Sequence, residues 1–390
     1  MSSALLSPSE RALARATRLQ RAVHTLRSEA DTRGREATAV GTGLLIGCTP
    51  FWGVHFFLCW GVGRLLRLNR LKLYLSANLV NPVILPALLY AEVQTGAWLR
   101  RGETLVLTRG SFATLSPWEF GGDLMLGSVV IGTTVGLLGA LVTYVARRPT
   151  PDPFYRQLAR RAADRYLDAG VTAWEFARGK LSGDPVYRYT LDTHLAGRTG
   201  TVVDLGCGQG LMLAVIAEAQ AVARDGLWPP ARPAAPAFSR MVGIELRTRL
   251  ATMGARALHG EAEIRSGDIR SEGLPPADVV LIFDVLHMLP ADQHAPMLRA
   301  VVDALTHDGC LVVRDADASA GWRFWMVRLA NRLKSIATGR FRQRFAFRTA
   351  ADWRSLLASV GLVAYDLPMS EGTPFGNVLL VARRADAVTR

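Results

Sequence analysis

The stretch that decides the fold is Thr201–Gly210, TVVDLGCGQG, which runs directly into the apolar segment Leu211–Ala219. Its first five residues are β-branched or apolar around one acid, which is typical of a buried strand, and the segment after the glycines reads as a helix. Glycines let the backbone approach a ligand closely, and an acid near the end of the strand accepts hydrogen bonds from polar ligand groups. The stretch therefore predicts a strand, a glycine turn and a helix that together hold a ligand.

Further apolar runs repeat this pattern of a strand that ends in an acid. A second strand ends at Glu245, a third at Asp268 and a fourth, uncharged after Asp278, at Asp284. A fifth strand and a terminal pair are expected at 309–317, 361–365 and 377–382. Such alternation with helices predicts an open α/β sheet, which binds ligands at the carboxyl ends of its strands. The proline-rich segment Trp228–Pro236 fits neither a helix nor a central strand and is expected to be a surface insertion.

The heptapeptide DLGCGQG, Asp204–Gly210, resembles the first motif of class I S-adenosylmethionine-dependent methyltransferases; its G-x-G-x-G spacing differs from the dinucleotide-binding turn. The resemblance implies a Rossmann-like α/β domain over 185–390, mostly parallel with an antiparallel terminal strand, and S-adenosylmethionine as the cofactor. In that family the turn cradles the methionine portion, the second acid binds the ribose and the third reaches the adenine amino group. The cofactor-binding residues implied are Asp204, Gly206, Cys207, Gly208, Gly210, Glu245, Asp268, Ile269 and Asp284.

The segment DVLHMLP, Asp284–Pro290, resembles the fourth motif of small-molecule methyltransferases. Histidine titrates near neutral pH, so His287 is the first candidate for a general base, and Asp284 and Asp315 are the second choices. A buried structural histidine is the competing interpretation. Methyl transfer is an in-line displacement that requires no metal, and the four cysteines, which are far apart, predict reduced thiols and no structural metal.

The N-terminal half contains three long apolar runs, at 40–63, 73–99 and 124–146, separated by basic segments. The first is long enough to cross a hydrocarbon core of roughly 30 Å, but Pro50 near its middle predicts a kinked span or a re-entrant hairpin. In the second, Asn81-Pro82 and Pro86 predict broken helices whose backbone is satisfied by protein contacts. This half resembles the bacterial domain of unknown function 2062 over about 35–148. The resemblance rests on Gly47–Gly53, Asn69–Leu71 and Asn78–Pro82. The expected organisation is therefore a basic amphipathic helix at 1–37, an all-α membrane domain at 38–148, and a proline-rich linker with a helical lead-in at 149–184.

Residues 321–348 contain eight Lys or Arg and no acid, interleaved with aromatic side chains. Four roles fit this pattern. The segment can be a lid over an aromatic or acyl substrate, a membrane-facing helix, a dock for an acidic acyl carrier protein, or an amphipathic helix packed on the sheet with solvated arginines.

These features predict a membrane-tethered methyltransferase that acts on a small lipid-like, polyketide or aromatic substrate. The basic loops favour a catalytic domain on the cytoplasmic side of the bacterial inner membrane, and no cleaved signal peptide is expected. Trp353 and Gly372–Asn377 suggest kinship with aryl-polyene pathway enzymes. The alternative is a membrane transporter or sensor whose methyltransferase-like half only binds the cofactor. Nucleic acid is not expected as a partner despite the net charge of +13, because the fourth motif lacks the pattern of amino-group base methylation.

Overall fold

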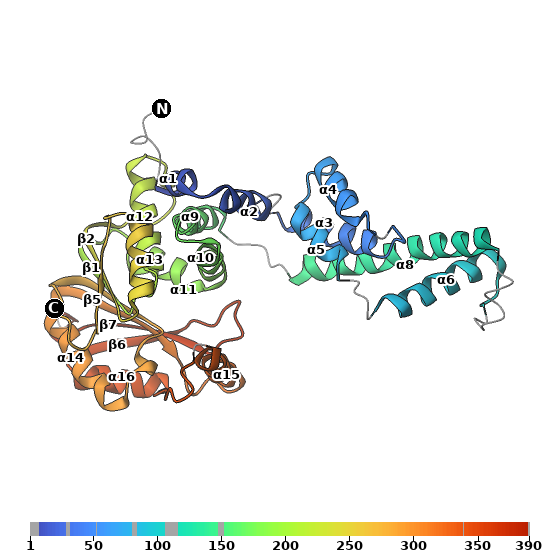
Figure 1. Cartoon of the computed structure of the whole chain (residues 1–390). Helices are drawn as coiled ribbons and strands as arrows, with labels where there is room; N and C mark the ends of the chain where they lie inside the picture. Colours follow the sequence, from blue (N-terminus) through green and yellow to red (C-terminus); the bar gives the residue numbers. More distant parts are fainter. Residues whose placement is uncertain are drawn as a thin grey trace. The chain divides into compact units, whose positions relative to one another are not determined.

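The computed structural model describes residues 8–28, 32–51, 53–79, 84–105, 116–146, 152–337 and 339–388. The chain divides into two compact units (Figure 1). We call Met1–Gln20 together with Asp152–Arg390 the sheet unit, and Arg21–Pro151 the helical unit. Each is described by itself below.

The sheet unit is built on a seven-stranded sheet in the order β3-β2-β1-β4-β5-β7-β6. The first five strands of that order are parallel, and β7 is antiparallel to both β5 and β6. This confirms the predicted Rossmann-like fold with an antiparallel strand near one edge. The strands are β1 Thr199–Leu205, β2 Ala237–Glu245, β3 Glu263–Ser266, β4 Ala277–Phe283, β5 Leu305–Ala316, β6 Leu362–Pro368 and β7 Asn377–Arg384.

Helices cover both faces of this sheet, with α12 and α13 on one side and α14 and α16 on the other (Figure 1). The strand order turns at β1 and β4, so the carboxyl ends of these two strands open a crevice. The helices of this unit are α1 Pro8–Arg15, α9 Pro153–Asp164, α10 Val171–Gly183, α11 Pro185–Thr193, α12 Leu211–Arg224, α13 Thr248–Leu258, α14 His294–Ala304, α15 Trp322–Ala337, α16 Ala350–Ser359 and α17 Ala385–Val388, with short 3-10 turns at Leu286–Met288 and Ala291–Gln293.

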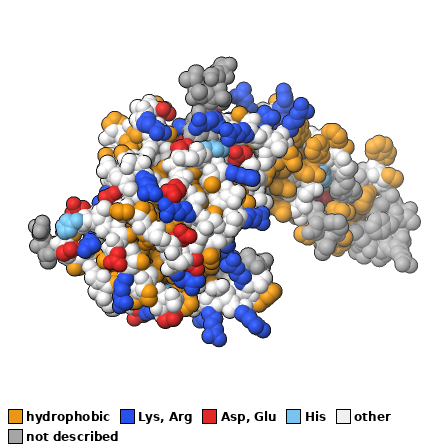
Figure 2. Space-filling view, turned by 60° about the vertical axis from the view of Figure 1, so that its left-hand side comes forward, with side chains coloured by type: hydrophobic (Ala, Val, Ile, Leu, Met, Phe, Trp, Pro, Cys, Tyr) orange, Lys and Arg blue, Asp and Glu red, His pale blue; other side chains and the backbone are white. Residues whose placement is uncertain are grey.

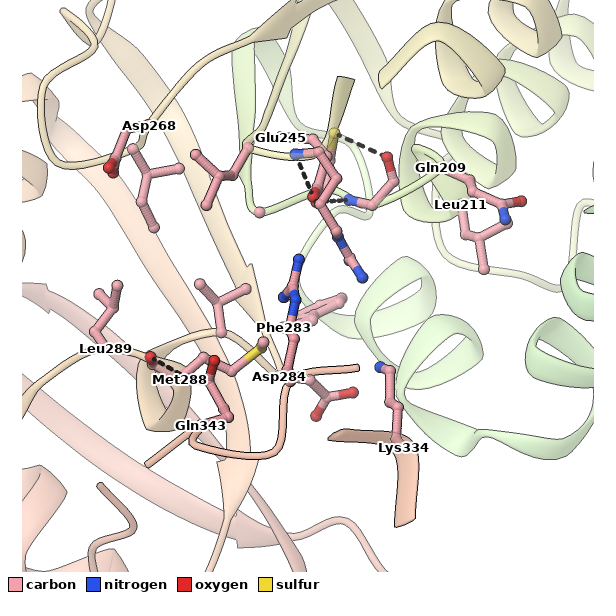
Figure 3. Close-up of a pocket in the computed structure, with 18 of the residues that line it drawn as sticks. Gln209, Leu211, Glu245, Asp268, Phe283, Asp284, Met288, Leu289, Lys334 and Gln343 are labelled. Carbon is pink, nitrogen blue, oxygen red and sulfur yellow. Dashed lines mark hydrogen bonds and ion pairs between the residues drawn. The ribbon is translucent and has the colours of Figure 1, made fainter. Parts of the chain in front are cut away.

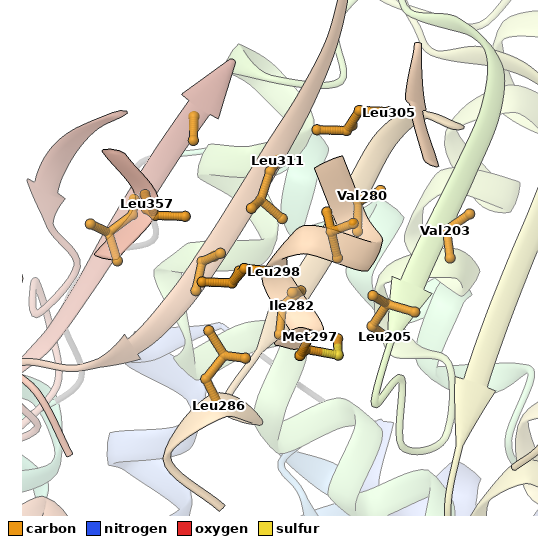
Figure 4. Packing of buried hydrophobic residues seen from close by; sticks show 14 of the residues in the cluster. Val203, Leu205, Val280, Ile282, Leu286, Met297, Leu298, Leu305, Leu311 and Leu357 are labelled. Carbon is orange, nitrogen blue, oxygen red and sulfur yellow. The ribbon is translucent and has the colours of Figure 1, made fainter. Parts of the chain in front are cut away.

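The core between the sheet and α14 and α16 fixes the strand ends that form the crevice. Alternate residues of β1 and β4, such as Val203 and Val280, face Leu298 of α14 (Figure 4). Trp353 of α16 is 1% exposed and belongs to the same cluster. Full burial of one such apolar side chain stabilises the fold by roughly 1.5–3 kcal/mol. The helix that carries Trp353 begins with a capping box between Thr349 and Asp352.

The segment 152–184 belongs to the sheet unit, although the sequence predicted a linker and lead-in ahead of a domain beginning at 185. Arg165, which is fully buried, pairs with Glu218 of α12 at 2.7 Å and with Glu261 at 3.1 Å. The Tyr166 hydroxyl donates to the carbonyl oxygen of Gln209 in the glycine turn. The segment is helical, as predicted, and these buried pairs make it part of the sheet unit, which resumes at Asp152. The pairs join residues far apart in the chain, so the sequence carries no signature of them. Residues 149–151 of the predicted linker lie outside the described residues.

The predicted insertion Trp228–Pro236 is irregular, as expected, and forms ion pairs with the segment 152–193 that precedes the first strand. Arg232 pairs with Asp152 and Asp192, both at 2.6 Å. Asp152 is also the N-cap of α9, since its carboxylate accepts from the backbone of Tyr155. The insertion therefore stabilises the start of α9.

The helical unit consists of short helices and one long one. Its bounds are α2 Arg18–Ser28, within which the division between the units falls, α3 Arg33–Gly47, α4 His55–Leu65, α5 Arg70–Ala77, α6 Leu85–Arg101 and α8 Pro117–Ala146. The first two apolar runs are each broken into two helices, at 48–54 and after Ala77; Trp52 and Val80–Pro82 lie outside the described residues. Within the described part of the chain, α8 is the one helix long and apolar enough to cross a membrane. The single helix expected at the N-terminus is two helices, because Thr17 and Gln20 form a reciprocal cap at the start of α2.

Glycines bring the helices of this unit into close contact. A Cβ atom at Gly41 of α3 would lie 2.6 Å from the carbonyl oxygen of Gly136 in α8, and one at Gly127 would lie 1.7 Å from that of Glu92. Such small-residue contacts are typical of helix packing in membranes. Asp123 of α8 is fully buried and pairs with Arg100, at 3.0 Å, and with Arg101.

Candidate active site

A cavity of about 400 Å³ opens at the carboxyl ends of β1, β2 and β4 (Figure 3). Seven of the nine predicted cofactor residues line it, namely Gly206, Cys207, Gly208, Glu245, Asp268, Ile269 and Asp284. Asp204 and Gly210 do not line it, and neither does His287. The volume lies within the range of small-molecule sites.

The glycine turn places its backbone against the cavity. Gly206 has a φ of 72°, and a Cβ atom there would lie 2.4 Å from Cγ2 of Val285. Gly208 has a φ of 60° and open space where its Cβ would be. Its amide donates to Glu245 Oε2 at 2.9 Å, and Glu245 Oε1 accepts from the backbone and guanidinium of Arg247. The turn and the second strand's acid therefore form one hydrogen-bonded wall.

Asp204, near the end of β1, is buried with 4% exposure. Burial, and next the neighbouring carboxylate of Glu245, raises the pKa of Asp204 to about 7. Folding therefore favours the protonated form of Asp204 relative to the unfolded chain, and ionisation of this group weakens the fold.

This pKa shift predicts a pH-dependent stability that Asp204→Asn removes. Because the folded pKa lies above the unfolded one, near 3.9, the contribution is fully present below about pH 4 and is lost as the pH rises through 7. Each pKa unit corresponds to about 1.4 kcal/mol. In thermal unfolding of the full chain in detergent, the melting temperature of Asp204→Asn minus that of the wild type should increase steadily from pH 4 to pH 7. A difference that is flat across this range would contradict the raised pKa.

Asp268 and Ile269 follow β3 at the far end of the cavity. The Asp268 carboxylate accepts from the backbone and guanidinium of Arg270, with distances of 2.5–3.1 Å. The hydrogen bond from the Arg270 side chain holds the pKa of Asp268 below the ordinary value for an aspartate. Asp268 is therefore an ionised acceptor at the position that the resemblance assigned to the adenine end.

Asp284 adopts a left-handed backbone conformation, with a φ of 59°, and lies in a network of charged side chains in which Arg314 is buried and Asp284 is partly exposed. Arg314 of β5, which is 3% exposed, donates to Asp284 at 2.5 Å and to Asp184. Lys180 lies 3.4 Å from Asp284 and 2.8 Å from Asp184. Burial opposes ionisation of Asp284, but Arg314 and Lys180 outweigh it, so the pKa of Asp284 lies below its usual value. Asp284 is therefore better suited to position groups than to take a proton.

His287 forms a buried pair with Asp315. Its Nδ1 lies 2.6 Å from Asp315 Oδ1, and its backbone N–H donates to Asp315 Oδ2 at 3.0 Å. Its ring stacks on Phe347 at 5.0 Å. Burial opposes protonation, but Asp315 and a hydrogen bond with Asn331 outweigh it, so the pKa of His287 is raised. Since Nδ1 faces Asp315, Nε2 is the nitrogen available for proton transfer.

Several lining residues were not predicted. Lys180 of α10 and Tyr187 of α11 line the cavity. Lys334 of α15 and Gln343, in the segment after that helix, line it as well (Figure 3). A second cavity of about 130 Å³ shares Lys334 and Gln343 and adds Asn331, the partner of His287. Of these residues, only Lys334 and Gln343 lie in a segment with a sequence signal, 321–348, for which a lid over the substrate is one of the four predicted roles.

Residues 156–367 match a family described as "Methyltransferase domain", and residues 16–150 match a family described as an uncharacterized protein conserved in bacteria, the domain of unknown function 2062. The first match covers more than half of the chain, so the protein belongs to the methyltransferase-domain family. This confirms the two predicted resemblances and the class of enzyme. S-adenosylmethionine, the cofactor predicted from the sequence, fits the glycine turn and the carboxylate of Glu245 described above.

Solved structures similar to the chain include one described as a complex with SAH and two described as methyltransferases. The DhpI–SAH complex is 18% identical, with a TM-score of 0.38 over 59% of this chain and 95% of that one. Magnesium protoporphyrin IX methyltransferase from Synechocystis PCC 6803 with bound SAH is 19% identical, with a TM-score of 0.33 over 62% and 91%. The mitomycin 7-O-methyltransferase MmcR is 17% identical, with a TM-score of 0.38 over 90% and 94%. No curated protein matches the chain.

Proposed function

We propose that the protein is a membrane-tethered S-adenosylmethionine-dependent methyltransferase that acts on a small lipid-like, polyketide or aromatic acceptor. One observation carries the proposal: a single cavity runs from the glycine turn and Glu245 to Met288, Lys334 and Gln343. A cofactor bound at the first end therefore has room for an acceptor at the second, next to the segment that carries His287.

Different residues serve cofactor binding and proton transfer in the proposed methyl transfer. When bound, the cofactor supplies an electrophilic methyl group. The turn at Gly206 and Gly208 and the carboxylate of Glu245 would hold and orient it. His287 Nε2 accepts the proton of the acceptor, and Asp315 stabilises the imidazolium that results. His287 is 4% exposed beneath Phe347, so the acceptor reaches it when the segment that bears Asn331 and Phe347 moves.

Membrane attachment is supported by the helical unit. Near its C-terminal end α8 exposes Leu137, Leu141, Val142 and Val145, each more than half accessible. Such an apolar helix surface is costly in water and is expected to contact lipid. We place the protein at the bacterial inner membrane, with the sheet unit on the cytoplasmic side. Trp353 is a core residue, so it supports the fold of the sheet unit but not a narrower aryl-polyene pathway.

The test uses the full chain in detergent micelles. We expect calorimetry to detect S-adenosylmethionine binding at micromolar concentration, and tritiated cofactor to transfer label to an organic-extractable product in bacterial membrane extract. Label that appears only in protein would instead favour a carrier-bound acceptor. Binding without any transfer would support the alternative of a transporter or sensor, and absence of binding would refute the proposal.

A further inference from the structure

Helix α15, Trp322–Ala337, has two opposite faces, and only one of them packs on the sheet unit. Val327, 6% exposed, and Ser335, 5% exposed, lie on the inner face, and Asn331 between them lines the second cavity. These three residues recur at a spacing of four, so they share one side of the helix. The inner face therefore closes the acceptor end of the site.

The outer face is a stripe of large apolar side chains. Its members recur at spacings of three and four, which places them on one side of a helix, about 180° from the inner face. They are Trp322, 65% exposed, Trp325, 59%, Leu329, 38%, Leu333, 57%, and Ile336, 45%. We call these five residues the outer stripe. A contiguous exposed apolar surface of this kind marks an interaction site.

The charged residues of α15 and of the segment that follows it, up to Arg348, have one sign. Arg328 and Arg332 are exposed along its flank, and Arg342 and Arg344 are exposed in the segment that follows. No acid occurs between Gly321 and Arg348. Figure 2 shows Lys and Arg side chains that project beside hydrophobic surface at the lower part of the molecule. The surface therefore combines apolar side chains, tryptophans and cations.

This combination identifies the occupant as an anionic lipid surface. A bilayer interface accepts apolar side chains into the acyl boundary and tryptophans at headgroup level, while anionic headgroups attract the flanking arginines. A second copy of α15 would bring cations against cations, which opposes self-association through this face. The same chain carries α8, the candidate membrane span, so a bilayer is the surface that the chain is expected to meet.

We propose that α15 is an interfacial membrane-binding helix whose outer stripe inserts into an anionic bilayer while its inner face covers the active site. A lipid-like acceptor would then move from the bilayer to the cavity beneath the same helix. That consequence rests on the proposed function, whereas membrane insertion of the stripe does not.

The experiment uses the full chain in vesicles of phosphatidylglycerol and phosphatidylethanolamine. A photoreactive benzoylphenylalanine replaces Leu329 or Leu333 in the outer stripe, or Val363 of β6 as a matched control that is apolar and 51% exposed. We expect lipid adducts at positions 329 and 333 and few at 363. Equal lipid labelling at all three positions, or adducts with protein in place of lipid, would overturn the proposal; protein adducts would indicate a second copy or an acidic partner protein.

A second experiment tests whether the positive charge contributes to membrane binding. The double change Arg328→Gln and Arg342→Gln removes two exposed cations and leaves the outer stripe in place. Arg332 is kept, because it donates a hydrogen bond to the carbonyl oxygen of Phe341 at 3.0 Å. Since one basic residue near an anionic bilayer contributes about 1 kcal/mol, the ratio of inserted to free helix should fall by about 30-fold. Lipid labelling should decrease in the same way in phosphatidylcholine vesicles, and unchanged labelling in both cases would refute the role of charge. S-adenosylmethionine binding is measured on every sample, so a failure of the proposed function and a failure of membrane insertion are seen separately.

Discussion

Gly206→Ala should abolish S-adenosylmethionine binding, with a loss of at least about 100-fold. Alanine at a φ of 72° is strained, and its Cβ would lie 2.4 Å from Cγ2 of Val285. Strain of this kind costs on the order of 1–3 kcal/mol, and relief of the clash requires the turn or Val285 to move. Any such movement shifts the amide of Gly208 away from Glu245, and so disrupts the wall on which the cofactor would lie.

The measurement is calorimetry on the full chain, with thermal unfolding to show that the variant is folded. Gly179→Ala is the matched control, because Gly179 is exposed within α10 and has nothing within 4 Å of its Cβ position. We expect the control to bind as the wild type does. If Gly206→Ala also bound with unchanged affinity, the glycine turn would not be the cofactor site.

Glu245→Gln removes a charge with little change of volume and tests the proposed ribose role of this carboxylate. The amide oxygen can still accept hydrogen bonds, but the NH2 group can only donate, so one of the bonds from Gly208 and Arg247 is lost. We expect calorimetry to show weaker binding than in the wild type but stronger binding than in Gly206→Ala.

The sheet could be predicted because its signals are local. The sequence around Asp204 contains both the strand and the turn, and the apolar run before Asp284 is of the type buried on both faces of a parallel sheet. The acids at the strand ends then meet at one edge, because parallel strands share their carboxyl ends. Seven of the nine residues implied by the family resemblance line the cavity for this reason.

The parts that were not predicted depend on contacts between distant residues. Arg165 becomes part of the sheet unit through Glu218 and Glu261, and Lys180 reaches the cavity through Asp284 and Asp184. None of these ion pairs has a periodic signature in the sequence. The composition of 321–348 left four roles open, because periodicity indicates which side chains share a face of α15 but not which face is covered. The structure shows which face of α15 is covered, since Val327 is buried and Trp325 is exposed.

His287→Asn should reduce methyl transfer by about 10²–10⁴-fold, the usual contribution of a general base, while cofactor binding is retained. Asp315→Asn should cause a smaller loss and change the pH profile. Asp315 raises the pKa of His287 against the effect of burial, so its removal lowers that pKa. Because the base acts in its neutral form, the rise of kcat/KM with pH should move to lower pH in Asp315→Asn.

His294→Asn is the matched control for this prediction, since His294 is a fully buried histidine that bonds to the carbonyl oxygen of Leu286. Its loss should lower thermal stability but leave the pH profile of kcat/KM in place. The rates are measured with the acceptor obtained from membrane extract and are expressed per molecule of cofactor bound. A pH profile that shifts equally in Asp315→Asn and His294→Asn, or full activity of His287→Asn, would make the His287–Asp315 pair structural. The acceptor would then have to lose its proton to solvent before it binds, because Arg314 and Lys180 lower the pKa of Asp284 and make this carboxylate a weak base.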